Sequence, residues 1–270
     1  MKKLLISLTV IAMVIIVLVA CGEAEVEEQV SLIPEELIQI SKDHNAGLEY
    51  IYNGLINSED LSNSTEKVKK LTAEYYNTVY PEYEDAAIEY LNKGADRLEV
   101  YYDKLSLAKN TGKAVEDSYI LYVIEEISDS LSDEQISLLM EINDISKSPS
   151  IDYIVSQVDD MINNKIPLLP EDERNLLYGT ALMCRYSSEY WNENYDEWIN
   201  LLSTDETLSK ASFDWGAVAD ADVGTCITVL SGWATAAWLG ATLPGLTFIV
   251  VTTGVASVVS SGVNAAQQIR

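Results

Sequence analysis

Residues 223–269 read VGTCITVLSGWATAAWLGATLPGLTFIVVTTGVASVVSSGVNAAQQI and contain no charged residue over 47 positions. Pro244-Gly245 interrupts this stretch near its middle, and both residue types end helices. We therefore predict two apolar helices joined by a turn, over about 217–242 and 246–268. Residues 216–270 are named the hairpin segment below.

Small side chains recur every four residues along both predicted helices. Such ridges allow two helix backbones to approach closely, as in helices that pack in lipid. We therefore predict that the two arms pack on each other through these faces. The ridge residues are Gly224, Thr228, Gly232, Ala236 and Gly240 in the first arm and Thr253, Ser257, Ser261 and Ala265 in the second, with Gly254, Gly262 and Ala266 beside the latter.

The environment of the hairpin segment is left open by the sequence. About 20 helical residues span roughly 30 Å, enough to cross hydrocarbon, but Gly, Ser and Thr dilute the hydrophobicity. The segment is expected to form the core of the protein or of an oligomer, to enter a membrane, or to bind a dedicated protein partner. All five tryptophans lie between Trp191 and Trp238 and fit each alternative.

The preceding residues, 22–215, have a different composition, with 41 acidic and 14 basic side chains. Apolar residues recur at helical spacing and do not alternate as in strands. Helix starts are indicated at Pro34, Ser64, Ser132 with Gln135 three residues on, and Pro170. These patterns predict an all-α fold, an acidic bundle or array of seven or eight helices followed by the apolar hairpin. The longest helix is expected from Pro170 to about Ser203.

The N-terminus has the features of a secretory signal. Two lysines precede an uncharged run from Leu4 to Ala20, which is followed by Cys21. The sequence Leu18-Val19-Ala20-Cys21 resembles the lipobox of bacterial lipoproteins, which implies cleavage after residue 20 and lipidation of Cys21. We expect a signal peptide over 1–20, an acidic tether over 21–33, an acidic helical domain over 34–215 and the hairpin over 216–270. The expected location is the cell envelope, at the outer membrane if the host is Gram-negative.

The charge balance excludes one class of partner. The chain has 17 basic and 43 acidic residues, a formal net charge of −26 and a pI of about 4.1. Nucleic-acid binding requires clustered Lys and Arg, which this chain lacks. The predicted partners are the membrane, through a lipid on Cys21, and a protein or second copy bound through the hairpin segment.

Two short motifs carry a further resemblance. His44-Asn45 follows the lipobox, Ser187-Ser188-Glu189-Tyr190-Trp191 comes later, and a Gly/Ala-rich tail closes the chain. Together they resemble a loosely defined group of uncharacterised Bacteroidota lipoproteins, with His44, Asn45, Ser188, Tyr190 and Trp191 as the motif residues. The composition of the tail is also similar to that of Gly-rich class II bacteriocins. The chain lacks a double-glycine leader, however, and the tail has no basic residue before Arg270.

Catalytic groups are sparse. His44 is the only histidine, so a zinc site built from several His and Cys ligands is not available, and no Gly-x-Ser-x-Gly elbow occurs. Cys184 and Cys226 are expected either to form a disulfide or to stay as buried thiols. We predict no catalytic residues, no metal and no cofactor, and therefore a non-enzyme.

Three functions remain as hypotheses. The first is a lipoprotein with a structural or interaction role, and the second is a membrane-active effector that inserts the hairpin. The third is a glycan- or peptide-binding lipoprotein that uses tyrosines such as Tyr76 and Tyr102, although their spacing also fits a helix core face.

Overall fold

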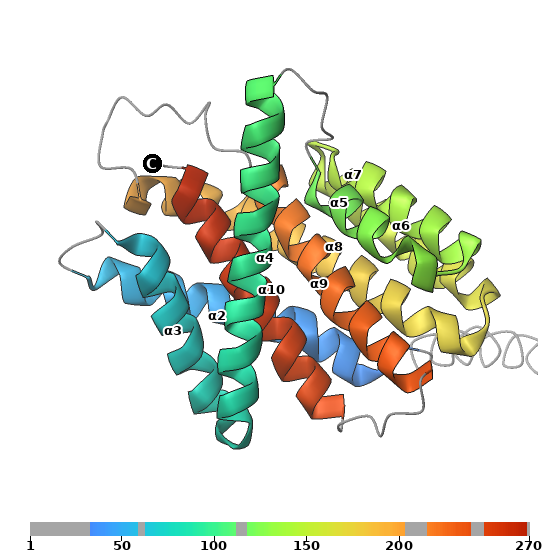
Figure 1. The fold of residues 1–270 in the computed structure, drawn as a ribbon, viewed down its shortest axis with the longest axis horizontal. Coiled ribbons are helices and arrows are strands. Elements are labelled where there is room, and N and C mark those ends of the chain that lie inside the picture. The colour runs from blue at the N-terminus through green and yellow to red at the C-terminus, as the bar shows by residue number, and fades with distance from the viewer. Residues whose placement is uncertain (1–32, 59–62, 112–117, 203–214, 239–245, 269–270) are drawn as a thin grey trace, which may run out of the picture. The chain divides into compact units, whose positions relative to one another are not determined.

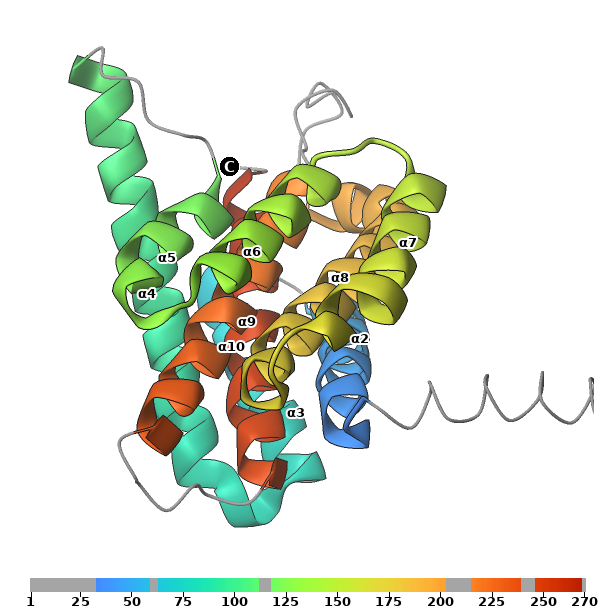
Figure 2. The same ribbon diagram turned by 90° about the vertical axis from the view of Figure 1, so that its right-hand side faces the viewer.

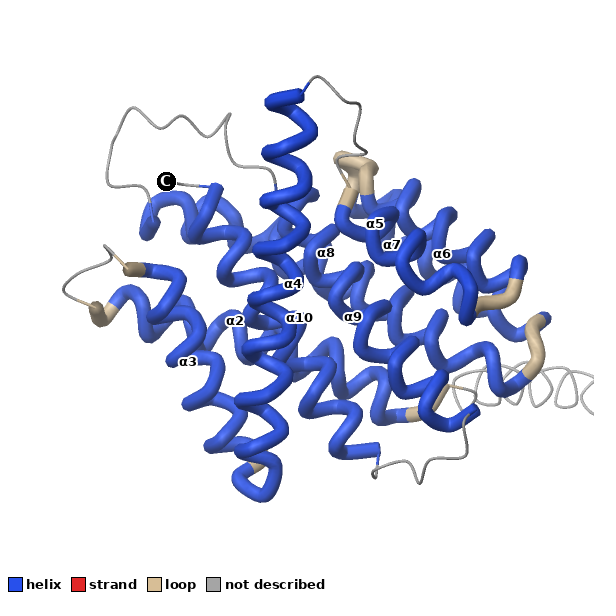
Figure 3. Tube along the Cα trace, in the orientation of Figure 1, coloured by secondary structure: helices blue, strands red, loops and turns tan. Residues whose placement is uncertain are grey.

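The computed structural model describes residues 33–58, 63–111, 118–202, 215–238 and 246–268, and these residues fold into α-helices joined by turns (Figures 1 and 3). No strand occurs among them, which confirms the predicted all-α class. The described helices belong to one compact unit, Glu35–Arg270. They are α2 (Glu35–Ile56), α3 (Ser64–Val79), α4 (Glu84–Thr111), α5 (Tyr119–Ile127), α6 (Asp133–Ser146), α7 (Ile151–Asp160), α8 (Glu171–Leu202), α9 (Trp215–Trp238) and α10 (Leu246–Gln268).

Local side-chain chemistry sets several helix starts. At α6 the Ser132 hydroxyl accepts from the Gln135 backbone N–H while the Gln135 side chain accepts from the Ser132 N–H, a reciprocal capping box. Ser118 caps α5 and Ser150 caps α7, each through a hydroxyl that accepts from the backbone N–H three residues on. Acidic residues occupy the first turns of α2, α6 and α8, where the helix dipole favours negative charge.

Helix α10 is the central element of the fold. It contacts α9, α4, α2 and α3, and in Figures 1 and 2 it runs between these helices. Its segment Phe248–Ala265 is the one helical stretch in the described residues that has the length and composition to cross a membrane. Within the fold, however, 89% of that segment is buried. The apolar hairpin segment therefore supplies much of the core around which the acidic helices pack.

The two arms pack on each other, as predicted, but three glycines of the predicted small-residue faces lie against the acidic helices instead. These three glycines make room for side chains from α3 and α5, because a Cβ at any of them would overlap such a side chain, whereas a Cβ on Gly232 meets nothing within 4 Å. The pairs are Gly224 with Tyr119 of α5, Gly254 with Tyr76 of α3 and Gly262 with Val68 of α3.

The two arms do pack on each other, through hydroxyl-bearing faces. Thr225 of α9 donates a hydrogen bond of 3.0 Å to Ser260 of α10, and both are buried. Ser257 and Ser261, from the predicted ridge of the second arm, contact Asp222 of α9. The contact is therefore polar as well as close, and it fixes the register between the arms.

Candidate functional site

The two motif segments of α2 and α8 meet at one buried carboxylate, that of Asp222 on α9. Nε2 of His44 lies 3.2 Å from Oδ2 of Asp222, and neither side chain has exposed surface. Ser187 donates a hydrogen bond of 2.5 Å to the same oxygen, and Ser261 of α10 donates one of 2.9 Å. Trp191 Nε1 donates to Ser261 over 3.0 Å. We call these five residues the Asp222 cluster, and it joins α2, α8, α9 and α10.

The neighbours of His44 indicate its protonation state. The Asn45 amide donates to the carbonyl of Tyr186 over 3.0 Å, which leaves Asn45 Oδ1 facing His44 Nδ1 at 2.9 Å. That oxygen can only accept, so Nδ1 carries a hydrogen. Nε2 faces the Asp222 carboxylate, which attracts it only if Nε2 carries a hydrogen as well. His44 is therefore assigned as the imidazolium cation.

Electrostatics support this assignment. Burial by itself lowers the pKa of His44, but the charge of Asp222 and hydrogen bonding to Asp222 and Asn45 outweigh it and raise the pKa above 6.5. With 3.2 Å between Nε2 and the carboxylate oxygen Oδ2, the protonated His44 and Asp222 form an ion pair. The other carboxylate oxygen, Oδ1, has no hydrogen-bond partner among the described residues.

The geometry of the Asp222 cluster differs from that of a hydrolytic triad. In such a triad the serine hydroxyl is bonded to the imidazole, which removes its proton. Here the Ser187 hydroxyl is bonded to the carboxylate, and both nitrogens of His44 face other groups. Because His44, Ser187 and Asp222 have no exposed surface, this arrangement offers no substrate access. Its chemistry is that of a buried structural ion pair.

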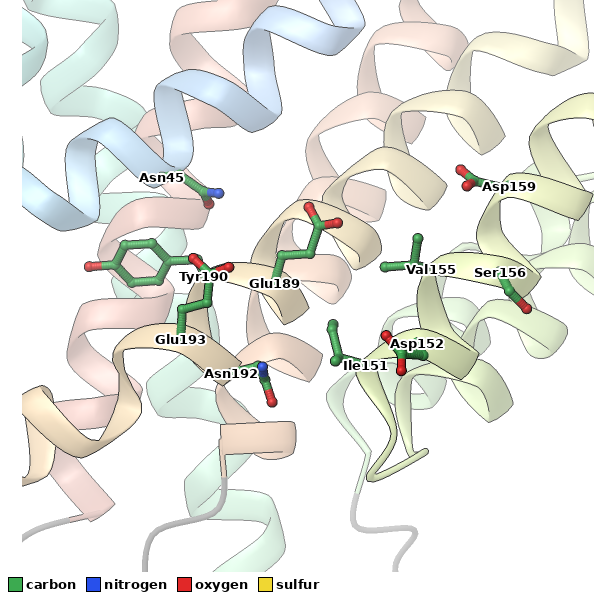
Figure 4. Close-up of a pocket in the computed structure, with 10 residues that line it drawn as sticks. All are labelled: Asn45, Ile151, Asp152, Val155, Ser156, Asp159, Glu189, Tyr190, Asn192 and Glu193. Carbon is green, nitrogen blue, oxygen red and sulfur yellow. The ribbon is translucent and has the colours of Figure 1, made fainter.

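An acidic cleft of about 700 Å³ lies between α7 and α8, next to the Asp222 cluster (Figure 4). The motif residues Asn45 and Tyr190 line it, and Asn45 connects it to His44. Arg185 partly neutralises the cleft through ion pairs with two of its carboxylates. The described residues contain no group of three His, Cys, Asp or Glu side chains that could hold a metal ion. The cleft carboxylates are Asp152, Asp159, Glu189 and Glu193.

A second carboxylate of α9 caps another helix. Asp220 accepts from the backbone N–H of Tyr119 at 2.5 Å and from that of Ile120 at 3.4 Å, at the start of α5. The Ser118 hydroxyl lies 2.9 Å from Asp220 and 2.7 Å from Asn143. Burial raises the pKa of Asp220 to about 6, although these hydrogen bonds act in the opposite direction. The start of α5 is thereby attached to α9.

The two cysteines that lie in the described residues are both buried, free thiols. Of the two predicted alternatives, the structure thus has the thiols and not the Cys184–Cys226 disulfide. Burial raises the pKa of the Cys184 thiol to about 12 and raises that of Cys226 as well. Neither thiol is therefore activated as a nucleophile.

The other residues that the sequence singled out lie in the core, at the surface of the core, or outside the described part of the chain. Ser188 and Tyr190 are buried, and the Tyr190 hydroxyl accepts from Trp198 over 3.0 Å. Tyr76 is a core residue with no exposed surface, while Tyr102 is half-buried. Outside what the structure describes lie Cys21, Gly240 and the side chain of Ala236.

Sequence reasoning missed the two aspartates of α9. Asp220 and Asp222 were assigned no role from the sequence. They are the only acidic residues in the hairpin segment, a signal that could have identified them. An acid in an otherwise uncharged buried helix requires a partner, and His44 is that partner for Asp222.

Comparison with known proteins gives no relative: no protein-family model, no curated protein and no solved structure matches this chain.

Proposed function

We propose that this protein is a lipid-anchored, non-catalytic module of the bacterial cell envelope, with a structural or interaction role. In this proposal Cys21 carries the lipid, the acidic helices face solvent, and the hairpin segment is the permanent core of the module. The proposal follows from the lipobox-like sequence together with the position of the hairpin in the fold.

The single observation that carries the proposal is the enclosure of the hairpin segment. To enter a membrane, α9 and α10 would have to leave the acidic helices and break the contacts of Asp222 with His44 and Ser187. The buried charge of Asp222 would then move into lipid or lose its partner, and either step is costly. Enclosure therefore favours a stable core over an inserting effector.

The same enclosure supports a non-catalytic role. The histidine is buried in an ion pair, and both described thiols have raised pKa values. Surface carboxylates are abundant, as expected for a solvated acidic face. A structural or binding role requires none of these groups to react.

The anchor is tested by metabolic labelling with a radioactive fatty acid in a bacterial host. We expect label and membrane association in the wild-type chain and neither in Cys21→Ala. Cys184→Ala is the matched control and should be labelled like the wild type, because its buried thiol has no part in anchoring. Labelling of Cys21→Ala equal to that of the wild type would show that Cys21 does not carry the lipid.

The role of the hairpin is tested by dye release from liposomes. The chain from Gly22 onward, which contains the whole unit Glu35–Arg270, is added at neutral and at acid pH. We expect no release at either pH. Release that disappears when the α10 segment is made polar, for example in Val255→Asp, would instead support the membrane-active alternative.

A further inference from the structure

We draw no further inference here: the strongest candidate, the acidic cleft between α7 and α8 that Asp152, Asp159, Glu189 and Glu193 line, carries none, because clustered carboxylates are expected on the surface of so acidic a chain and no second feature of the described residues points to a ligand there.

Discussion

His44 and Asp222 are each fully buried, so each depends on the other for its charge. Removing one partner of a buried ion pair leaves an uncompensated charge, which costs about 3–5 kcal/mol. We expect His44→Leu to lower the free energy of unfolding by about this amount, as measured by urea denaturation. In a double-mutant cycle with Asp222→Asn, the two losses should not add, because the second change removes the stranded charge.

The exposed pair Lys70–Glu74 provides the control for this experiment, since its side chains are 76% and 45% exposed. Lys70→Met should have little effect on stability.

The pKa of His44 is raised, so the contribution of its protonation to stability is complete below pH 6.5 and is lost as the pH rises through the pKa of the folded state. The loss caused by His44→Leu should therefore shrink at alkaline pH. Additive losses in the cycle at every pH would contradict the ion pair.

Asp220 predicts a second pH dependence. Its pKa rises from 3.8 to about 6 on folding, so its contribution to stability is present below pH 3.8 and is lost as the pH rises through 6. Asp220→Asn removes this titration. Between pH 4 and pH 7 the variant should gain stability relative to the wild type, by no more than about 3 kcal/mol. Urea denaturation at several pH values measures this difference, and a difference independent of pH would show that Asp220 is not buried as described.

At the scale of elements, glycines at two helix positions predict opposite effects of the same substitution. A Cβ on Gly94 of α4 would lie 3.0 Å from the backbone oxygen of Ala256 in α10, which cannot move aside, whereas Gly232 has open space. We expect Gly94→Ala to destabilise by about 1–3 kcal/mol through overpacking, despite the better helix propensity of Ala. Gly232→Ala should stabilise by up to about 1 kcal/mol.

Thermal unfolding followed by circular dichroism measures both variants under the same conditions. Equal shifts in the same direction would show that α4 and α10 do not approach as closely at Gly94 as described.

The elements themselves were predictable where the signals are local. The capping box at Ser132 marks the start of α6, and Pro170 precedes α8 as predicted. The second arm of the hairpin has the predicted bounds, because Pro244-Gly245 precedes a long uncharged run. Such signals depend on neighbouring residues and need no knowledge of the tertiary structure.

The contacts between elements were not predictable from one sequence. Small residues at intervals of four show that something approaches closely, but the pattern does not distinguish a partner backbone from a Tyr ring, as at Gly224. The partners of Asp222 lie on α2, α8 and α10, far from it in the chain. The histidine, the serines and the aspartate were all visible in the sequence, but their proximity was not.

At the scale of the whole molecule, the chain separates its charge from its apolar segment. Residues 22–215 carry a net charge of −27, while the hairpin segment carries only Asp220, Asp222 and Arg270. In the fold, α10 lies among α2, α3, α4 and α9, so acidic helices cover much of the apolar hairpin. We propose that this enclosure is permanent, with α10 as the core in the presence or absence of a membrane.

Hydrogen exchange of the α10 amides, followed by mass spectrometry, tests this claim most directly. In the chain from Gly22 onward, we predict that amides of Phe248–Ala265 are among the slowest to exchange, because core helices open only through global unfolding. Their exchange should be unchanged by anionic or neutral liposomes. Rapid exchange of these amides in buffer, or a change in their protection when liposomes are added, would contradict a permanent core.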